Sequence, residues 1–260
     1  MEHVKLSAIV LAKNEERSIE KCLHSLKSCD EVLVIDDNSS DRTAEIAKKC
    51  GAEVFKRDMK SDFAAQRNFG ASKAQGEWLL YVDADEVVSE ELAKEIYSVL
   101  HSKECPSNDS YYIRRRDVFW NHELRFGETM KARNKGIIRM MKKESGAWHG
   151  TVHEEFIPVS KPGTLHAHML HYPHQSIRIF LREINSYSSQ RAREMLKKHS
   201  TVNTFQLIAY PMGKFLLTYF IYLGFLDGAA GFAYSFLMSF HSFMVRAKLY
   251  QYAVIGTEST

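Results

Sequence analysis

The chain has 260 residues, a hydrophobic content of 45% and a charged content of 26%, values typical of a folded globular protein that buries a substantial core. Its net charge of +3 conceals an asymmetry, because residues 1–111 carry 15 Lys and Arg against 22 Asp and Glu, whereas residues 112–149 carry 10 against 4. The acidic first part, without a recognisable nucleic-acid module, argues against a nucleic-acid partner. The four cysteines form no Cys-x-x-Cys pair and no secretory signal precedes the first predicted strand, so we expect a cytoplasmic protein with free thiols.

Strands and helices are predicted to alternate over the first hundred residues. Apolar and β-branched stretches predict strands, and apolar positions recurring at the helical period predict helices. The predicted strands are residues 4–11, 32–35, 54–55 and 77–82, and the predicted helices begin near residues 14, 42 and 62. Because this order specifies a parallel sheet covered by helices, we expect an α/β fold with a Rossmann-like, nucleotide-binding first half.

The pattern changes after Pro106. Short strand candidates follow, separated by charged or Gly-containing turns, and we expect them to form a mixed sheet beside the first. They are residues 111–113, 118–120, 136–140 and 152–156. From Ser176 onward the pattern is helical, and one apolar stripe is predicted to comprise Ile177, Phe180, Leu181, Ile184 and Tyr187.

Two stretches without a charged residue, 215–226 and 229–245, dominate the last third of the chain. Neither reaches the roughly 20 residues that a bilayer-spanning helix needs. Aromatic residues are dense here, and Arg246 and Lys248 follow the second stretch. A helical hairpin lying on an anionic membrane surface fits these features, and a buried hairpin or a dimer interface is the alternative.

Asp83 and Asp85 stand one residue apart where the predicted strand 77–82 ends. Ligands of open α/β sheets bind beyond the carboxyl ends of the strands, and alternate residues of an emerging strand point the same way. Two carboxylates placed there can hold a divalent cation against a phosphate. The alternative is an acidic helix start, with Ser89 as the N-cap and two glutamates after it in the first turn.

Four segments, in this order, resemble the signatures of inverting family 2 glycosyltransferases of the GT-A fold. They are residues 6–16, 34–43, 65–68 and 83–86. Within that family the chain is most similar to lipopolysaccharide core β-glucosyltransferases, since the likeness continues through residues 152–154, 171–172 and 224–228. The resemblance implies a GT-A nucleotide-binding sheet with an adjoining mixed acceptor-side sheet and a C-terminal helical hairpin. It also implies an enzyme that uses UDP-glucose as its donor.

Asp37 follows the second predicted strand, where its carboxylate can accept a hydrogen bond from a pyrimidine N–H or a ribose hydroxyl. The resemblance puts the uracil contact on Asp37, with the Ala12 backbone, Asn14 and Glu15 nearby. A plain turn with a helix cap is the alternative. Asn38 departs from the Gly that many relatives carry, but Asn tolerates a left-handed backbone, so we expect little change in geometry.

A divalent cation neutralises the charge that develops on a nucleoside diphosphate leaving group. The resemblance implies Mg²⁺ or Mn²⁺, bound most directly by Asp85, with Asp83 leaning toward the ribose and His171 as a candidate third ligand. Other histidines crowd the same stretch of sequence, and a histidine that only hydrogen-bonds within the fold is the alternative.

Inversion at the anomeric carbon requires a base on the face opposite the leaving group. Strand alternation would send Glu154 and Glu155 to opposite faces, and the resemblance favours Glu154 as the catalytic base, with His153 beside the pyrophosphate or the base. A solvated acidic pair is the alternative. Arg67, near a predicted helix start, can pair with the donor phosphate, or it is a solvated surface charge.

Three consecutive arginines, Arg114 to Arg116, lie between the predicted donor half and the predicted base, where an acceptor would bind. A strand with three arginines in a row presents at least one to each face, so we expect at least one to meet an anion. A phosphorylated lipopolysaccharide core sugar, or another lipid-linked acceptor, fits this expectation.

We therefore expect an inverting glycosyltransferase that moves a hexose from a UDP-sugar onto a lipopolysaccharide inner-core sugar, at the inner face of the cytoplasmic membrane. Residues 1–175 are predicted to be the GT-A catalytic domain, with a donor half at 1–105 and an acceptor half at 106–175. Residues 176–260 are predicted to be a helical, membrane-associating region. The alternative hypotheses are transfer to a polyprenyl phosphate or a peptide, and a non-catalytic nucleotide-binding protein associated with the membrane.

Overall fold

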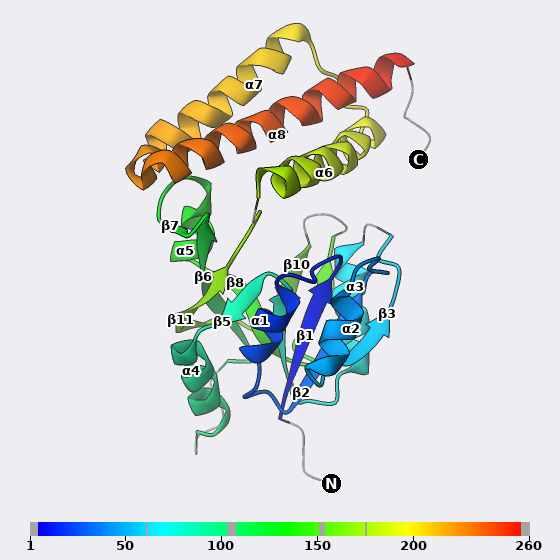
Figure 1. The fold of residues 1–260 in the computed structure, drawn as a ribbon, viewed down its shortest axis with the longest axis vertical. Helices are drawn as coiled ribbons and strands as arrows, with labels where there is room; N and C mark the ends of the chain where they lie inside the picture. The colour runs from blue at the N-terminus through cyan, green and yellow to red at the C-terminus, as the bar shows by residue number, and fades with distance from the viewer. Residues whose placement is uncertain (1–4, 61, 103–107, 151–153, 175, 256–260) are drawn as a thin grey trace. The chain divides into compact units, whose positions relative to one another are not determined.

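The structure is a computed structural model that describes residues 5–60, 62–102, 108–150, 154–174 and 176–255 (Figure 1). The chain forms two compact units. Unit 1 consists of Met1–Arg116 and Ala132–His171, and unit 2 consists of Asp117–Lys131 and Tyr172–Thr260.

Unit 1 is built on a sheet whose first part is parallel. Strand β1 pairs in parallel with both β2 and β4, and β3 pairs in parallel with β2. The bounds of these strands are β1 Leu6–Ala12, β2 Glu31–Asp36, β3 Glu53–Lys56 and β4 Trp78–Asp83. The α/β, Rossmann-like first half predicted from the sequence is confirmed.

The later strands form the expected mixed part, and this part is continuous with the first sheet. Strand β8 pairs antiparallel with β4, and the sheet continues through β6 and β11 to β5, while β7 pairs with the end of β6. Their bounds are β5 Glu86–Val88, β6 Ser110–Phe119, β7 His122–Leu124, β8 Ile137–Lys142 and β11 Gly163–His171. A separate pair, β9 (Gly146–His149) and β10 (Glu155–Pro158), is antiparallel. Two of the predicted short strands thus belong to the single strand β6.

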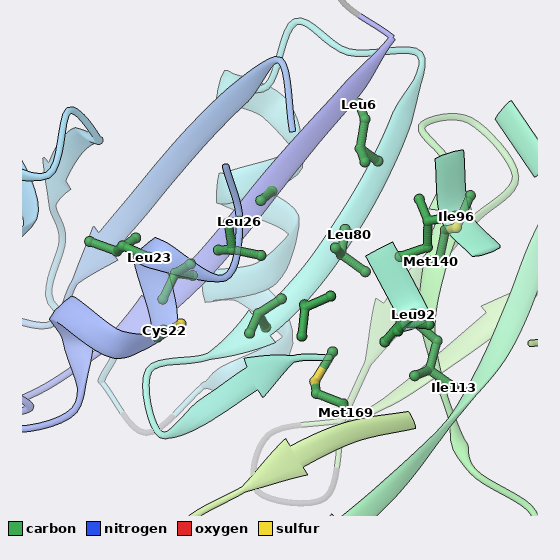
Figure 2. Close-up of a cluster of buried hydrophobic side chains, with 14 of the residues drawn as sticks. Leu6, Cys22, Leu23, Leu26, Leu80, Leu92, Ile96, Ile113, Met140 and Met169 are labelled. Atoms are coloured by element: carbon green, nitrogen blue, oxygen red, sulfur yellow. The ribbon is translucent and has the colours of Figure 1, made fainter. Parts of the chain in front are cut away.

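Helices pack on the sheet of unit 1 and enclose two apolar clusters. These helices are α1 Ile19–His24, α2 Thr43–Lys49, α3 Phe63–Lys73 and α4 Glu90–Leu100. The short helix α5 Met130–Asn134 has no buried residue, and its residues are divided between the two units. Figure 2 shows part of the larger cluster, where Cys22 of α1 and Leu92 of α4 approach Leu80 of the sheet. The second cluster includes Ile9 and lies against α3, where a Cβ atom on Gly70 would come within 2.5 Å of the Ile9 side chain. Tight helix packing therefore depends on glycine at this position.

Unit 2 is mainly helical. It contains α6 Ile177–Lys197, α7 Thr204–Leu216, a π-helical turn at Leu217–Ile221, a 3-10 turn at Gly224–Asp227 and α8 Gly228–Ile255. The predicted stripe on α6 is only partly correct, because Ile177, Leu181 and Tyr187 are 52%, 40% and 45% exposed. The buried positions recur every four residues instead, at Phe180, Ile184, Ser188 and Ala192.

The turn between α7 and α8 is held by glycines and one buried carboxylate. Gly228 has a φ of +61°, and a Cβ atom on Gly231 would come within 2.0 Å of the Gly224 carbonyl oxygen. Asp227 is 4% exposed and accepts backbone hydrogen bonds of 2.9 Å from Arg125 and from Phe126. The segment 224–228, quoted above for the family resemblance, thus ties the helical hairpin to the loop after β7 within unit 2.

Among the described residues, no single helix combines the length and hydropathy of a membrane span. Residues Thr204–Ile221 and Gly224–Ile255 meet that criterion only as a pair, with a bend of 72° between them. The predicted boundary after residue 175 falls near the start of the second part of unit 2 at Tyr172. Unit 2 also includes residues 117–131, since Phe119 and Leu124 share a buried cluster with α6.

Candidate active site

Two loops leave the carboxyl ends of β1 and β2 and are joined by hydrogen bonds. The Asn14 N–H donates to Ser39 Oγ at 2.9 Å, and the Ser40 N–H donates to Asn14 Oδ1 at 2.8 Å. The Glu15 N–H donates to Thr43 Oγ1 at 2.8 Å. Asn14 and Asn38 have φ values of +56° and +49°, so the left-handed backbone expected at Asn38 is confirmed.

Asp37 is held firmly at this edge. It is 5% exposed, its N–H donates to the Ala12 carbonyl at 2.9 Å, and its Oδ1 accepts from the Met59 N–H at 2.9 Å. Its Oδ2 accepts from Lys13 Nζ at 2.7 Å, although the Lys13 side chain is 58% exposed. The structure therefore groups Ala12, Asn14, Glu15 and Asp37 as predicted, and it adds Lys13, which sequence reasoning missed although it directly follows β1.

Asp83 lies between two buried arginines. Arg67 Nη2 donates to Asp83 Oδ1 at 3.0 Å, and Arg139 Nη2 donates to Asp83 Oδ2 at 2.5 Å. Burial alone would raise the pKa of Asp83, but the positive charges of Arg139 and Arg67 outweigh it and hold the pKa well below its usual range. Asp83 is therefore an ionised carboxylate clamped by guanidinium groups.

Arg139 had no predicted role and is the main residue missed. It is 5% exposed on β8, and it also donates to Glu86 Oε1 at 3.2 Å. Its pKa is raised by Asp83 and Glu86, which outweigh the opposing effect of burial. The only sequence signal was an arginine within the apolar run Ile137 to Met141.

Glu86 is a further member of this buried cluster of charged side chains. Its side chain is fully buried, and its Oε2 accepts the Asp83 N–H at 2.9 Å. Burial, together with the negative charge of Asp83, raises the pKa of Glu86, although Arg139 and Arg115 act in the opposite direction. Arg115 Nη1 lies 3.6 Å from Glu86 Oε1, so one arginine of the basic run meets an anion, as expected.

Arg67 connects Asp83 to the predicted base. Its Nε donates to Glu154 Oε1 at 3.0 Å, and its guanidinium lies 4.8 Å from the ring centroid of Trp148. Arg67 is 3% exposed, so the alternative of a solvated surface charge is wrong. Its Nη1 is buried and has no hydrogen-bond partner within the described part of the chain. Glu155 is exposed, so of the two neighbouring glutamates it is Glu154 that faces this cluster. His153, predicted beside the pyrophosphate or the base, lies outside the described residues.

Asp85 and His171 form a second pair beside this cluster. The register of β11 on β5 sets His171 opposite Glu86, and this brings His171 Nε2 to 3.1 Å from Asp85 Oδ2. This is a hydrogen-bond distance, so the contact matches the alternative of a histidine that hydrogen-bonds within the fold. It also matches two ligands of one cation, since ligands at right angles and each about 2.1 Å from an ion lie about 3 Å apart. Asp83 lies close to Asp85 in the chain, with both of its oxygens accepting from guanidinium groups, and its contact with a cation stays a prediction. No set of three His, Cys, Asp or Glu side chains converges on one point among the residues described, so further ligands would come from substrate or water.

The helix-cap alternative also holds, but for different residues. Ser89 Oγ accepts from the Leu92 N–H at 3.2 Å and is the N-cap of α4, with Glu90 and Glu91 in the first turn. The site interpretation and the helix-cap interpretation therefore apply to different residues. Asp83 and Asp85 belong to the charged cluster, whereas Ser89 caps α4. Cys22, behind the site, is a free thiol whose pKa is raised mainly by burial.

The loops, the carboxylates and Arg67 gather at the carboxyl edge of the parallel strands, which is where open α/β sheets bind their ligands. Residues 7–152, more than half of the chain, match the model of Glycosyl transferase family 2. The chain belongs to glycosyl transferase family 2, and the membership predicted from its sequence motifs is confirmed.

Relatives cover nearly the whole chain. An uncharacterized glycosyltransferase of Rickettsia typhi is 29% identical over 256 residues, which cover 94% of this chain and 86% of that protein. The lipopolysaccharide core biosynthesis glycosyltransferase LpsC of Rhizobium meliloti is 24% identical over 254 residues, covering 95% and 92%. Among solved structures, residues 1–349 of TarS from S. aureus align over 98% of this chain and 93% of that chain, with 15% identity and a TM-score of 0.45.

Proposed function

We propose that the protein is an inverting, divalent-cation-assisted glycosyltransferase that moves a hexose, glucose from UDP-glucose, onto a sugar of a lipopolysaccharide inner core. The observation that carries the proposal is the continuous chain of contacts Asp83–Arg67–Glu154 at the strand edge, beside the Asp85–His171 pair. These contacts link a donor-binding edge, a cation site and a base within one cluster.

The donor nucleotide would bind at the loops after β1 and β2. Asp37 would accept a hydrogen bond from the uracil N–H in place of the one that it accepts from Lys13. The exposed Lys13 ammonium would then be available to a phosphate. The hydrogen bonds between residues 14–15 and 39–43 fix the walls of this site before the donor arrives.

Asp85 and His171 would hold Mg²⁺ or Mn²⁺ against the diphosphate, and the cation supplies charge neutralisation for the leaving group. Arg67 would act from the other side, because its unpartnered Nη1 offers a further N–H to a phosphate oxygen. Arg139 keeps Asp83 ionised and fixed in position, which in turn fixes the guanidinium of Arg67. In this arrangement Asp83 is a positioning residue.

Glu154 would accept the proton of the acceptor hydroxyl as the oxygen attacks the anomeric carbon. Its Oε1 accepts from Arg67, which leaves Oε2 for the acceptor. The same arginine thus orients the base and faces the donor, and this links the two halves of an inverting displacement.

Two observations support a membrane-bound lipopolysaccharide acceptor. The relative LpsC carries lipopolysaccharide core biosynthesis in its name and aligns over 95% of this chain. Unit 2 exposes many large apolar side chains, including Phe205 at 76% and Ile221 at 69%, a surface that suits the interface of a membrane. We place the protein peripherally on the inner face of the cytoplasmic membrane.

Mass spectrometry of lipopolysaccharide from a strain lacking this protein tests the acceptor. The expected result is a core shortened by one hexose, together with restoration by the wild-type gene and by Glu155→Gln but not by Glu154→Gln. An unchanged core, with a hexose missing from a polyprenyl phosphate or a peptide, would move the proposal to those acceptors. Hydrolysis of UDP-glucose by the purified protein, abolished in Asp85→Ala, would argue against a non-catalytic role.

A further inference from the structure

A basic cavity of about 430 Å³ lies in unit 1. Its lining residues belong to strands β6 and β11 and to the end of α5. The residues that line it are Arg114, Arg116, Arg133, Asn134, His166 and His168. The cavity is large enough for a phosphate group together with part of the molecule that carries it.

Strand geometry explains why these side chains converge. Alternate residues of a strand share a face, so Arg114 and Arg116 point the same way while Arg115 points away toward Glu86. His166 and His168 are likewise alternate residues of β11, the neighbour of β6 in the sheet. Two adjacent strands therefore present four basic side chains to one cavity.

The charge of this cavity is of one sign. Its described lining contains three guanidinium groups, two imidazoles and one amide, and no carboxylate. The Nε atom of Arg114 is buried and makes no hydrogen bond to any described residue. Glu95 lies beside this lining, because its carboxylate accepts backbone hydrogen bonds of 2.8 Å from His166 and from Ala167. Several guanidinium groups gathered at one cavity attract an anion.

We propose that this cavity is an anion site that binds a phosphate ester or diphosphate group, separate from the donor site at the ends of β1, β2 and β4. Guanidinium groups bind phosphate oxygens with two parallel N–H···O bonds, and three of them can surround one phosphate. Asn134 adds a neutral donor, and the imidazoles of His166 and His168 add N–H donors from the strand β11. This inference stands on the cavity and does not require the proposed acceptor.

Strand alternation separates this cavity from the proposed active site. His168 and His171 are an odd number of residues apart on β11, so their side chains point to opposite faces of the sheet. His171 contacts Asp85, so the anion would bind on the face of the sheet opposite that pair. The phosphate could belong to a phosphorylated acceptor sugar or to the headgroup of an anionic lipid.

Pyrophosphate titration of the full chain, followed by calorimetry, tests the site. We expect saturable binding that weakens at least tenfold in Arg114→Gln and in Arg133→Gln. Arg178→Gln, which removes an exposed arginine of α6, is the matched control and should bind as the wild type does. In the same titration, the imidazole resonances of His166 and His168 should shift together with saturation, which locates the anion in this cavity.

Equal binding by all four proteins would overturn the proposal, and so would equal weakening in Arg178→Gln, because either result would mean a general charge effect. Circular dichroism confirms that each variant is folded, and Arg114→Lys provides a second variant that keeps the charge but loses the bidentate geometry.

Two further competition experiments identify the source of the phosphate. Competition of pyrophosphate by a phosphorylated sugar indicates an acceptor, and competition by vesicles containing phosphatidylglycerol, but not by neutral vesicles, indicates a lipid headgroup. A wild-type protein that binds pyrophosphate in this cavity but transfers no hexose would contradict the proposed function and leave the anion site supported.

Discussion

The two units differ in which side chains they bury and which they expose. Unit 1 buries a cluster of ionised residues, with Arg67, Glu86 and Arg139 each no more than 5% exposed. Its exposed large hydrophobic residues, among those described, are only Tyr97, Ile157 and Val159. Unit 2 instead exposes a long series of aromatic and aliphatic side chains on α7, α8 and the turn between them.

This difference indicates where each unit meets its partners. Burial of ions is costly unless they are paired and hydrogen-bonded, so a folded protein retains such a cluster chiefly where it does chemistry or fixes a geometry. A large exposed apolar surface is equally costly in water and marks a site of interaction. The proposed function therefore places catalysis in unit 1 and attachment in unit 2, and the predictions that follow test this division.

The largest expected effect is on catalysis at the charged cluster. Glu154→Gln should lower the rate of hexose transfer by about 10²–10⁴-fold while donor binding is kept, because the amide cannot accept the acceptor proton. Glu155→Gln is the matched control on the adjacent, exposed side chain, and its rate should equal that of the wild type. Single-turnover assays with a radiolabelled donor measure both. Equal rates for the two variants would remove Glu154 from the mechanism.

The next effect is on the stability of unit 1. Arg139→Met should lower the free energy of unfolding by about 3–5 kcal/mol, because it leaves the buried carboxylate of Glu86 without its main partner. Arg42→Met is the control, since Arg42 is paired with Glu16 at the surface and its loss should cost less than about 1 kcal/mol. Urea unfolding measures both. A cost for Arg139→Met as small as that for Arg42→Met would contradict the buried cluster.

The variant Arg139→Met also predicts the direction in which stability changes with pH. The pKa of Glu86 is already raised by burial, and loss of Arg139 should raise it further. A carboxyl group whose pKa is higher in the folded state than in the unfolded state stabilises the fold at low pH, and this contribution is lost as the pH rises through the folded-state pKa. The stability deficit of Arg139→Met should therefore be smaller at pH 5 than at pH 8, and Glu86→Gln should remove this dependence.

A smaller effect concerns attachment by unit 2. Phe205 and Phe236 are 76% and 56% exposed, and replacing either with Ser should weaken binding to anionic vesicles by about tenfold, since each loses the burial of one aromatic side chain. Tyr97→Ser removes an exposed aromatic residue from unit 1 and should leave vesicle binding unchanged. Sedimentation with vesicles measures the partition. If the variants instead convert a dimer to monomers and still bind vesicles, the apolar surface is a subunit interface.

The smallest predicted effect concerns the N-cap of α4, which should be independent of the Asp85–His171 pair. Ser89→Ala should lower the free energy of unfolding by about 1 kcal/mol, because the Leu92 N–H loses its side-chain acceptor, and it should leave donor binding unchanged. Ser98→Ala, at an exposed position in the same helix, is the control and should not lower stability. Thermal unfolding of both variants, with Ser89→Thr as a conservative rescue, provides the measurement.

The sequence predicted most reliably the features that are local. The parallel strands were readable because their residues are apolar without alternation, and the Ser89 cap and the left-handed Asn38 follow from residue type alone. Asp37, Arg67 and Glu154 were found through the family motifs. The structure then supplied the contact between Arg67 and Glu154, which are 87 residues apart in the chain.

The features that sequence reasoning missed depend on long-range pairing. Arg139 reaches Asp83, 56 residues earlier in the chain, only because β8 pairs antiparallel with β4, and nothing local specifies that pairing. The buried stripe of α6 differs from the prediction for the same reason, since Ala192 is buried in a cluster with Leu249 and Tyr252 of α8, which lie far later in the chain. For Asp83 the structure adds two arginine partners that the sequence did not reveal.

The central claim is that Asp85 and His171 form the cation end of a sugar-donor site, and calorimetric titration of UDP with and without Mn²⁺ tests it most directly. The account predicts that Mn²⁺ strengthens UDP binding at least tenfold in the wild type and in Glu90→Gln, which alters an exposed carboxylate of α4. The same ion should have no effect on UDP binding in Asp85→Ala. Undiminished strengthening by Mn²⁺ in a folded Asp85→Ala protein would contradict the account.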